Sequence, residues 1–177
     1  MSRISRKELL QKKDSIIKNA VEKGVTWETI TFAKEFGDYL AREQGDAEEK
    51  ETETRTFKGK EAEVEVVFKK LTTSQVRKFF GEVKRQQMTG YTPSSFVLLK
   101  PKLAYAVGRA EKKEPRNAEQ KIEKSKIIDF YDVLVVAIDT VITEEKKGNK
   151  DAFKNFIAIF EAIVAYHKYA EAGNVQK

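Results

Sequence analysis

The fold is decided by residues 127–142, which read IIDFYDVLVVAIDTVI. Wound as a helix, this segment presents apolar side chains on nearly every face, and a helix of that kind is usually buried at the centre of a bundle. A membrane span needs about 20 consecutive apolar residues, a length that no stretch of the chain reaches. We therefore predict a long central helix over residues 119–143 and no membrane partner.

Two amphipathic helices are predicted near the N-terminus. Apolar side chains recur at helical spacing over residues 6–22, and Gly24 ends that segment. Thr26 suits the N-cap of a second helix. The apolar stripe of this second helix consists of Trp27, Ile30, Ala33, Phe36 and Leu40. Both helices are expected to pack into the core.

Two more helices are predicted in the middle of the chain. Thr72 and Gln75 have the spacing of a capping box, which starts a helix over residues 73–88. Pro101 suits the first turn of a helix and disfavours helical geometry just before it. We therefore expect another helix over residues 101–113, with one continuous helix kinked at Pro101 as the alternative.

The last helix is expected to begin after Asp151 and carries the sequence AFKNFIAIFEAIVAYHKYA, residues 152–170. Its phenylalanines and isoleucines recur at helical spacing. Strand patterns are nearly absent from the chain. The predicted fold class is therefore all-α, a compact bundle of five to six helices.

Residues 43–66 differ from the segments around them. Within residues 43–65 there are nine acidic and four basic residues, few apolar side chains and two glycines. Such a segment cannot offset the entropy lost on ordering, so we predict an acidic flexible linker or insertion. Val64, Val66 and Phe68 alternate with Glu65 and Val67, a pattern compatible with a short extended segment.

The length of 177 residues favours one domain. We predict a single helical domain over residues 1–177, with a helical pair in residues 1–42 and a basic helical core in residues 67–177. The chain has no cysteine, which agrees with a reducing compartment. Its N-terminal residues lack the apolar core of a secretory signal, so a cytoplasmic location is expected.

Positive charge is concentrated in the middle of the chain. The net charge of the whole chain is +6, whereas residues 69–126 alone contain 15 Lys and Arg against 5 Glu. The segments before and after are slightly acidic. A local excess of this kind attracts polyanions, because each neutralised phosphate releases condensed counterions.

Residues suited to catalysis are few. His167 is the only histidine and lies near the end of the last helix, where it has no second His or Cys with which to bind a metal. Asp129, Asp132 and Asp139 share one face of the central helix. They could hold Mg²⁺, but pairing with cations on neighbouring helices is the favoured interpretation. No phosphate-binding loop or nucleophile motif is present, so we expect neither enzyme activity nor a cofactor.

The helix over residues 73–88 has a cationic side. On a helical wheel the apolar residues fall within about 100° of arc, and four cations fall in a band roughly opposite. These cations are Arg77, Lys78, Lys84 and Arg85. Residues seven apart are spaced by about 10 Å along the axis, a reach that suits phosphates on a strand.

The next helix combines cations with an aromatic ring. Lys102, Arg109 and Lys113 share one face, with Tyr105 between them. Interleaved cations and aromatic rings are typical of RNA-binding surfaces, where phosphates supply affinity and a ring stacks on a base. A core tyrosine with a satisfied hydroxyl is the equal alternative for Tyr105.

Three segments in this order resemble the small subunit of Csm-type complexes, the type III-A CRISPR effectors. They are LTTSQVRKFFGEV at 71–83, LLKPKLAYAVGR at 98–109 and FKNFIAIFEAIVAYHKY at 153–169. The second and third segments are the most specific of the three.

The resemblance implies a non-catalytic subunit whose copies stack head to tail as an inner filament. It further implies that the filament holds target RNA paired with guide RNA through sequence-independent contacts. The backbone subunits and the large subunit are the implied partners and carry the cleavage activities. The RNA-facing positions that the resemblance implies are Arg77, Lys78, Lys100, Lys102, Tyr105 and Arg109, whereas Lys84 and Arg85 rest on the helical wheel alone.

Two other functions remain open at the level of sequence. A helical interaction adaptor would use the same basic helix to bind an acidic protein. An Mg²⁺-dependent RNA-processing enzyme would use the three aspartates of the central helix.

Overall fold

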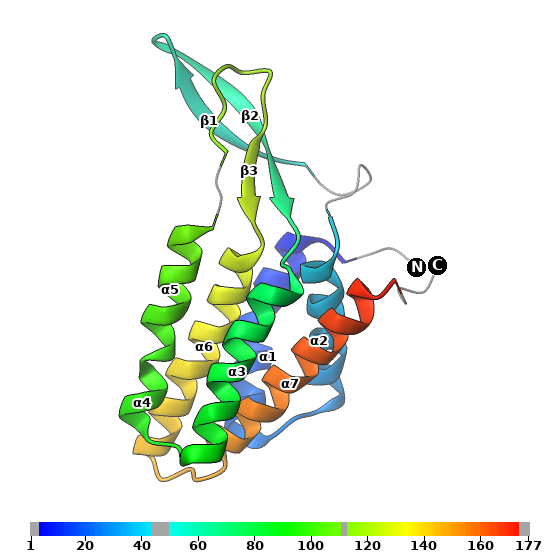
Figure 1. The fold of residues 1–177 in the computed structure, drawn as a ribbon. Helices are drawn as coiled ribbons and strands as arrows, with labels where there is room; N and C mark the ends of the chain where they lie inside the picture. The colour runs from blue at the N-terminus through cyan, green and yellow to red at the C-terminus, as the bar shows by residue number, and fades with distance from the viewer. Residues whose placement is uncertain (1–3, 44–49, 111–112, 174–177) are drawn as a thin grey trace.

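The computed structural model describes residues 4–43, 50–110 and 113–173 (Figure 1). Its helices are α1 (Arg6–Lys23), α2 (Trp27–Ala41), α3 (Thr73–Thr89), α4 (Pro93–Val97), α5 (Leu99–Arg109), α6 (Ile127–Lys146) and α7 (Ala152–Glu171). They form a bundle with a small sheet at one end. The protein is therefore mostly helical, as predicted, but the prediction of a purely α fold is wrong.

Local capping signals set the ends of several helices where the sequence predicts them. The Thr72 hydroxyl accepts a hydrogen bond from the backbone N–H of Gln75, and Gln75 accepts one from the backbone of Thr72. Thr26 caps α2. Gly24 and Gly90 follow α1 and α3 with φ of 102° and 95°, a region that favours glycine.

The acidic segment forms strands. β1 (Glu51–Phe57) and β2 (Lys60–Lys69) make an antiparallel hairpin, and β3 (Ile122–Ser125) pairs in parallel with β2. The linker prediction is thus wrong for residues 51–66, whereas residues 44–49 lie outside the described part. Val64, Val66 and Phe68 bury one face together with Ile122, which is supplied by a distant part of the chain. Burial of this apolar face offsets the conformational entropy that is lost when the strands become ordered.

The central helix begins later than the sequence predicts. α6 starts at Ile127, because residues 122–125 belong to β3. The helix over residues 101–113 is likewise shifted: α5 starts at Leu99 and ends at Arg109. Pro101 lies in its first turn, where the missing N–H has no partner to lose.

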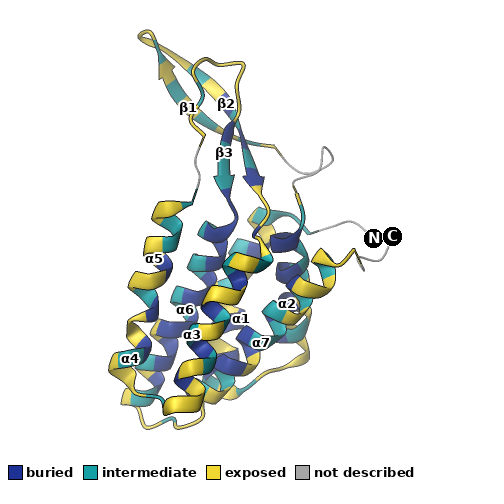
Figure 2. Ribbon diagram, in the orientation of Figure 1, coloured by how far each residue is buried: buried dark blue, intermediate teal, exposed yellow. Residues whose placement is uncertain are grey.

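The core lies between α6, α7 and the helices around them, as the dark residues in Figure 2 show. The ring of Phe156 lies 5.0 Å from that of Phe96 and 5.9 Å from that of Phe160, centroid to centroid. Trp27 is an exception to the predicted stripe of α2: it is 84% exposed at the first residue of the helix, so its place in the core is a wrong prediction.

Gly37 allows α2 and α7 to cross closely. A Cβ atom there would lie 2.7 Å from the backbone nitrogen of His167 and 3.0 Å from the carbonyl oxygen of Ile163. Gly37→Ala should therefore lower the free energy of unfolding by about 1 to 3 kcal/mol, since the two backbones must separate. Urea unfolding measures this change.

Gly81→Ala on α3 is the matched control, because a Cβ atom at that position meets nothing within 4 Å. It should stabilise the protein by roughly 0.5 to 1 kcal/mol through helix propensity. If the two substitutions had the same effect, the close crossing at Gly37 would not be a constraint on the fold.

Candidate nucleic-acid interface

One side of α3 packs and the other presents charge. Val76, Phe79 and Val83 are buried against the core, which turns Arg77 and Lys78 to the solvent. Neither of these two cations forms an ion pair with any described residue. Both are therefore available to an external anion.

The other two predicted cations of α3 already have partners. Lys84 pairs with Glu161 of α7, and Arg85 pairs with Glu82 one turn earlier at 2.9 Å. Glu82 also accepts a hydrogen bond from Lys102 of α5. Lys102, and then Arg85, hold the pKa of Glu82 below its usual range.

The Lys102–Glu82 pair fixes how α3 and α5 align. The helices run in opposite directions: α3 descends from the sheet, and α5 rises towards it (Figure 1). Arg77 and Lys78 precede Glu82 by four or five residues, and Arg109 follows Lys102 by seven. At 1.5 Å per residue, all three lie about 6 to 10 Å nearer the sheet than the pair does.

The remaining predicted residues lie on and after α5. Lys100 pairs with Asp139 at 2.6 Å. The guanidinium of Arg109 lies over the ring of Tyr105, 5.6 Å from its centroid, and Tyr105 is 62% exposed. Tyr105 is therefore not a core residue. Lys113 is exposed, with its ammonium 3.9 Å from Glu123.

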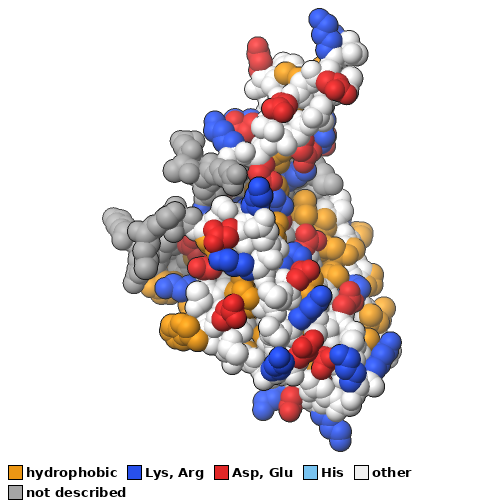
Figure 3. Space-filling model, turned by 180° about the vertical axis from the view of Figure 1, so that it is seen from behind, with side chains coloured by type: hydrophobic (Ala, Val, Ile, Leu, Met, Phe, Trp, Pro, Cys, Tyr) orange, Lys and Arg blue, Asp and Glu red, His pale blue; other side chains and the backbone are white. Residues whose placement is uncertain are grey.

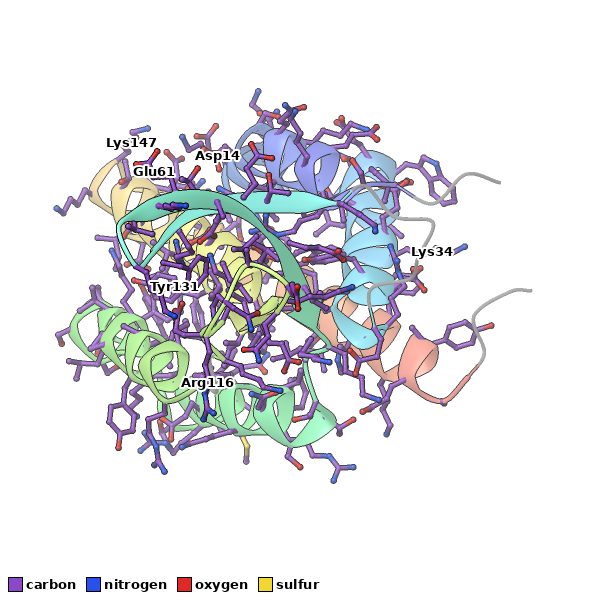
Figure 4. The ribbon with its side chains drawn as sticks, turned by 90° about the horizontal axis from the view of Figure 1, so that it is seen from above. Asp14, Lys34, Glu61, Arg116, Tyr131 and Lys147 are labelled. Carbon is purple, nitrogen blue, oxygen red and sulfur yellow. The ribbon has the colours of Figure 1, made fainter. Side chains whose placement is uncertain are left out.

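Arg116 is a surface cation that the sequence analysis did not select. It lies in the loop that leads into β3, and Figure 4, looking down on the sheet, shows it on the side of α3 and α5. Its side chain forms no ion pair with a described residue. Its only sequence signal is membership of the basic middle segment.

These positions define a cation surface at the sheet end of the bundle, consisting of Arg77, Lys78, Arg109 and Arg116. The paired cations Lys84, Arg85, Lys100 and Lys102 lie further from the sheet along the same two helices. When an unpaired cation contacts an external anion, no free energy is spent on breaking an internal ion pair first.

Two of the three carboxylates considered for Mg²⁺ are paired with cations of the same chain. Arg6 donates hydrogen bonds to both oxygens of Asp129 at 2.7 and 2.8 Å, and the Tyr39 hydroxyl donates a third at 2.6 Å. Asp139 pairs with Lys100. Among the described residues no group of three His, Cys, Asp or Glu side chains is placed to hold a metal ion. The pairing of Asp129 and Asp139 with cations confirms the interpretation favoured by the sequence.

His167 is a structural residue. It is 1% exposed, and its Nε2 lies 2.8 Å from the carbonyl oxygen of Leu71, which joins α7 to the start of α3. Among the helices that the structure describes, none combines the length and apolarity that a membrane span requires.

The described residues thus form a helical bundle with a small sheet at one end and a cation surface beside that sheet. Residues 50–172 match the family described as Csm2 Type III-A, and the chain belongs to this family of small subunits of type III-A CRISPR effector complexes. The match covers β1 to α7, including the hairpin that the resemblance left outside. No curated protein and no solved structure matches the chain significantly.

Proposed function

We propose that this chain is a non-catalytic subunit that holds target RNA, paired with guide RNA, by contacts between its cation surface and phosphates. The observation that carries the proposal is the pair Arg77 and Lys78, exposed on α3 and free of ion pairs with described residues. Family membership supports the proposal, because the family consists of small subunits of type III-A CRISPR effector complexes.

The outer face of α3 suits a sugar–phosphate backbone. Ser74 and Gly81 are exposed on the same side of the helix as the two cations, and nothing lies within 4 Å of a Cβ atom placed at Gly81. A strand can therefore approach the helix closely while Arg77 and Lys78 reach its phosphates. Contacts of this type are independent of base sequence.

The other cations form a second, weaker set in the proposal. Lys84, Arg85, Lys100 and Lys102 must release an intramolecular carboxylate before they bind a phosphate. Lys113, whose ammonium lies 3.9 Å from Glu123, extends the cation surface towards the sheet. Further partners in the proposal are the backbone and large subunits of the complex and other copies of the chain in a head-to-tail filament.

The test is the double variant Arg77→Ala with Lys78→Ala, assembled into the complex. Loss of two phosphate contacts should weaken target RNA binding by roughly tenfold to a hundredfold near 0.1 M salt. It should also reduce the slope of log K against log[salt] by about 1.4 to 1.8. Filter binding across a salt series measures both, and the variant should show no change in sequence preference.

The matched control removes two exposed cations on other helices, Lys18→Ala with Lys34→Ala. Figure 4 shows Lys34 projecting from α2 on the side away from α5. An equal loss in both double variants would mean that only net charge matters. Unchanged RNA binding by the α3 variant would show that this face has another partner, such as an acidic protein.

A further inference from the structure

The β1–β2 hairpin projects from the sheet end of the bundle (Figure 1), and Figure 3 shows basic side chains at its tip. The turn consists of Lys58 and Gly59, next to the pair of Phe57 with Lys60. Along β2, Lys60 is separated from Lys69 by nine residues, a reach of about 30 Å at roughly 3.3 Å per residue. Lys58 and Lys60 are exposed, and neither forms an ion pair with a described residue. The hairpin therefore holds two available cations away from the bundle.

The backbone at Lys58 indicates that the lysine side chain has a function. Its φ is 50°, the only positive φ of a non-glycine residue in the described part of the chain, and Gly59 follows with φ of 79°. A hairpin turn with two positive φ angles favours Asn-Gly, because asparagine adopts positive φ more easily than lysine does. Lysine therefore occupies this position despite backbone strain, and residues under such strain cluster at functional sites.

The two faces of the hairpin differ in charge near the turn. Successive residues of a strand point to opposite faces. Phe57 and Lys60 therefore share the face of the buried cluster, whereas Glu61 and Glu63 share the other face with the threonines of β1. Both glutamates are exposed. Near the turn a polyanion is attracted to the first face and repelled by the second.

The face that carries Lys60 turns towards the cation surface of the bundle. Arg55 lies on this face, and its guanidinium is 3.5 Å from the carboxylate of Glu114, in the loop that contains Arg116. Figure 4 shows Glu61 on one side of the hairpin and Arg116 on the other. An RNA strand that follows the cation surface past Arg116 therefore meets Lys60 and not the glutamates.

We propose that the tip of the β1–β2 hairpin is a separate RNA-binding site, at which Lys58 and Lys60 contact phosphates of the RNA that α3 holds. The inference rests on the proposed function for its ligand and adds a contact outside the bundle. The turn is fixed before RNA binds, since all of β1 pairs with β2 and the Phe57 ring packs against the buried cluster. The conformational entropy lost on binding is then mainly that of two lysine side chains.

The double variant Lys58→Asn with Lys60→Thr removes both charges and keeps the hairpin. Asparagine suits the turn and threonine suits a strand, so urea unfolding should show a protein at least as stable as the natural chain. In the assembled complex the variant should bind target RNA about fivefold to fiftyfold more weakly near 0.1 M salt, with the slope of log K against log[salt] reduced by about 1.4 to 1.8. Unchanged affinity and slope would overturn the proposal.

Glu61→Gln with Glu63→Gln is the matched control, because it changes the charge of the same hairpin by two on the opposite face. It should strengthen RNA binding by less than about threefold, since these side chains contact no phosphate and salt screens their charge. A gain as large as the loss in the lysine variant would mean that only the net charge of the hairpin matters, which would also overturn the proposal.

The variant Arg77→Ala with Lys78→Ala separates this inference from the proposed function. If that variant loses RNA affinity and the hairpin variant does not, the tip is not a binding site and the proposed function stands. If neither variant loses affinity, both proposals are wrong. Losses in both variants support both proposals.

The chain contains no cysteine, so a single cysteine that carries a photocrosslinker reports what lies beside the turn. In the assembled complex with target RNA, Lys60→Cys should crosslink to RNA. Thr56→Cys, on the opposite face, should do so at least about fivefold less efficiently. A crosslink from position 60 to a protein subunit instead of RNA would show that the hairpin has a protein partner and would overturn the proposal.

Discussion

Replacing Asp129 by alanine should lower the free energy of unfolding by about 3 to 5 kcal/mol, the cost of removing one partner from a buried charge pair. The carboxylate is fully buried and holds the guanidinium of Arg6 through two hydrogen bonds. Burial and the charge of Asp129 raise the pKa of the Tyr39 hydroxyl, which stays protonated and donates a third. Alanine would leave the Tyr39 hydroxyl and two of the three guanidinium nitrogens of Arg6 without their acceptor.

The effect should extend into the hairpin. Arg6 also donates to Glu51 at the start of β1 and lies 4.0 Å from the centroid of the Phe68 ring in β2. Because one guanidinium joins α1, α6 and both strands, loss of its anchor at Asp129 should free the hairpin from the bundle. Amide hydrogen exchange of residues 51–69 should accelerate more than exchange in α7.

Asp132→Asn is the control for this prediction. Asp132 is half-buried on the same helix, and it accepts no hydrogen bond from the described residues. Its substitution should change stability by no more than about 0.5 kcal/mol. Urea unfolding compares the two variants, and an Asp129→Ala cost no larger than that of Asp132→Asn would show that the Arg6–Asp129 pair does not hold the fold together.

The parts of the fold that follow from local chemistry are predictable from the sequence. Thr26, Thr72 and Gly24 mark helix ends through contacts within four residues, so the predicted boundaries of α1 and α3 differ from the structure by one residue. The stripe of α7 is buried at Phe156, as its period predicts.

The parts that depend on distant residues are not predictable in this way. β3 pairs with β2 across more than 50 residues of chain, and Ile122 is buried in a cluster whose other members come from β2. By local pattern, residues 119–126 continue a helix. The hairpin is too polar to predict alone, since β1 alternates Glu with Thr and its apolar partners come from β2.

The same distinction applies to the candidate site. The helical wheel selects Arg77 and Lys78 correctly as exposed cations, because burial on an amphipathic helix follows from its own sequence. It cannot show that Glu161 and Glu82 neutralise Lys84 and Arg85, since those pairs depend on packing. Whether the unpaired set contacts RNA stays a prediction.

Lys126 shows that a cation of the basic middle segment need not be part of the charged surface. It belongs to the basic middle segment, yet it is 0% exposed. Its ammonium donates to the carbonyl oxygens of Tyr39 and Arg42 at 2.7 and 2.8 Å and lies 4.0 Å from the centroid of the Tyr39 ring. Lys126 therefore supplies hydrogen-bond donors to carbonyl groups at the C-terminal end of α2. A side chain buried in this way cannot contact RNA.

This position makes stability depend on pH. Burial, and then the charge of Arg42, lower the pKa of Lys126 from 10.5 to about 7. Between pH 7 and 10 the unfolded chain therefore binds this proton and the folded chain largely does not, so raising the pH favours the folded state. From pH 7 to pH 9 the gain should be about 2 kcal/mol. The neutral amine still donates both hydrogen bonds.

Lys126→Met removes this pH dependence and both hydrogen bonds. At pH 9 the variant should be less stable than the natural chain by about 2 to 4 kcal/mol, because two buried carbonyl groups lose their donor. At pH 7 the difference should shrink by about 2 kcal/mol, since the natural chain then bears the cost of burying a charge. Urea unfolding of both proteins at the two pH values measures the change. A difference that is the same at pH 7 and pH 9 would mean that Lys126 keeps its proton in the folded state, with the two carbonyl groups and the Tyr39 ring holding the charge.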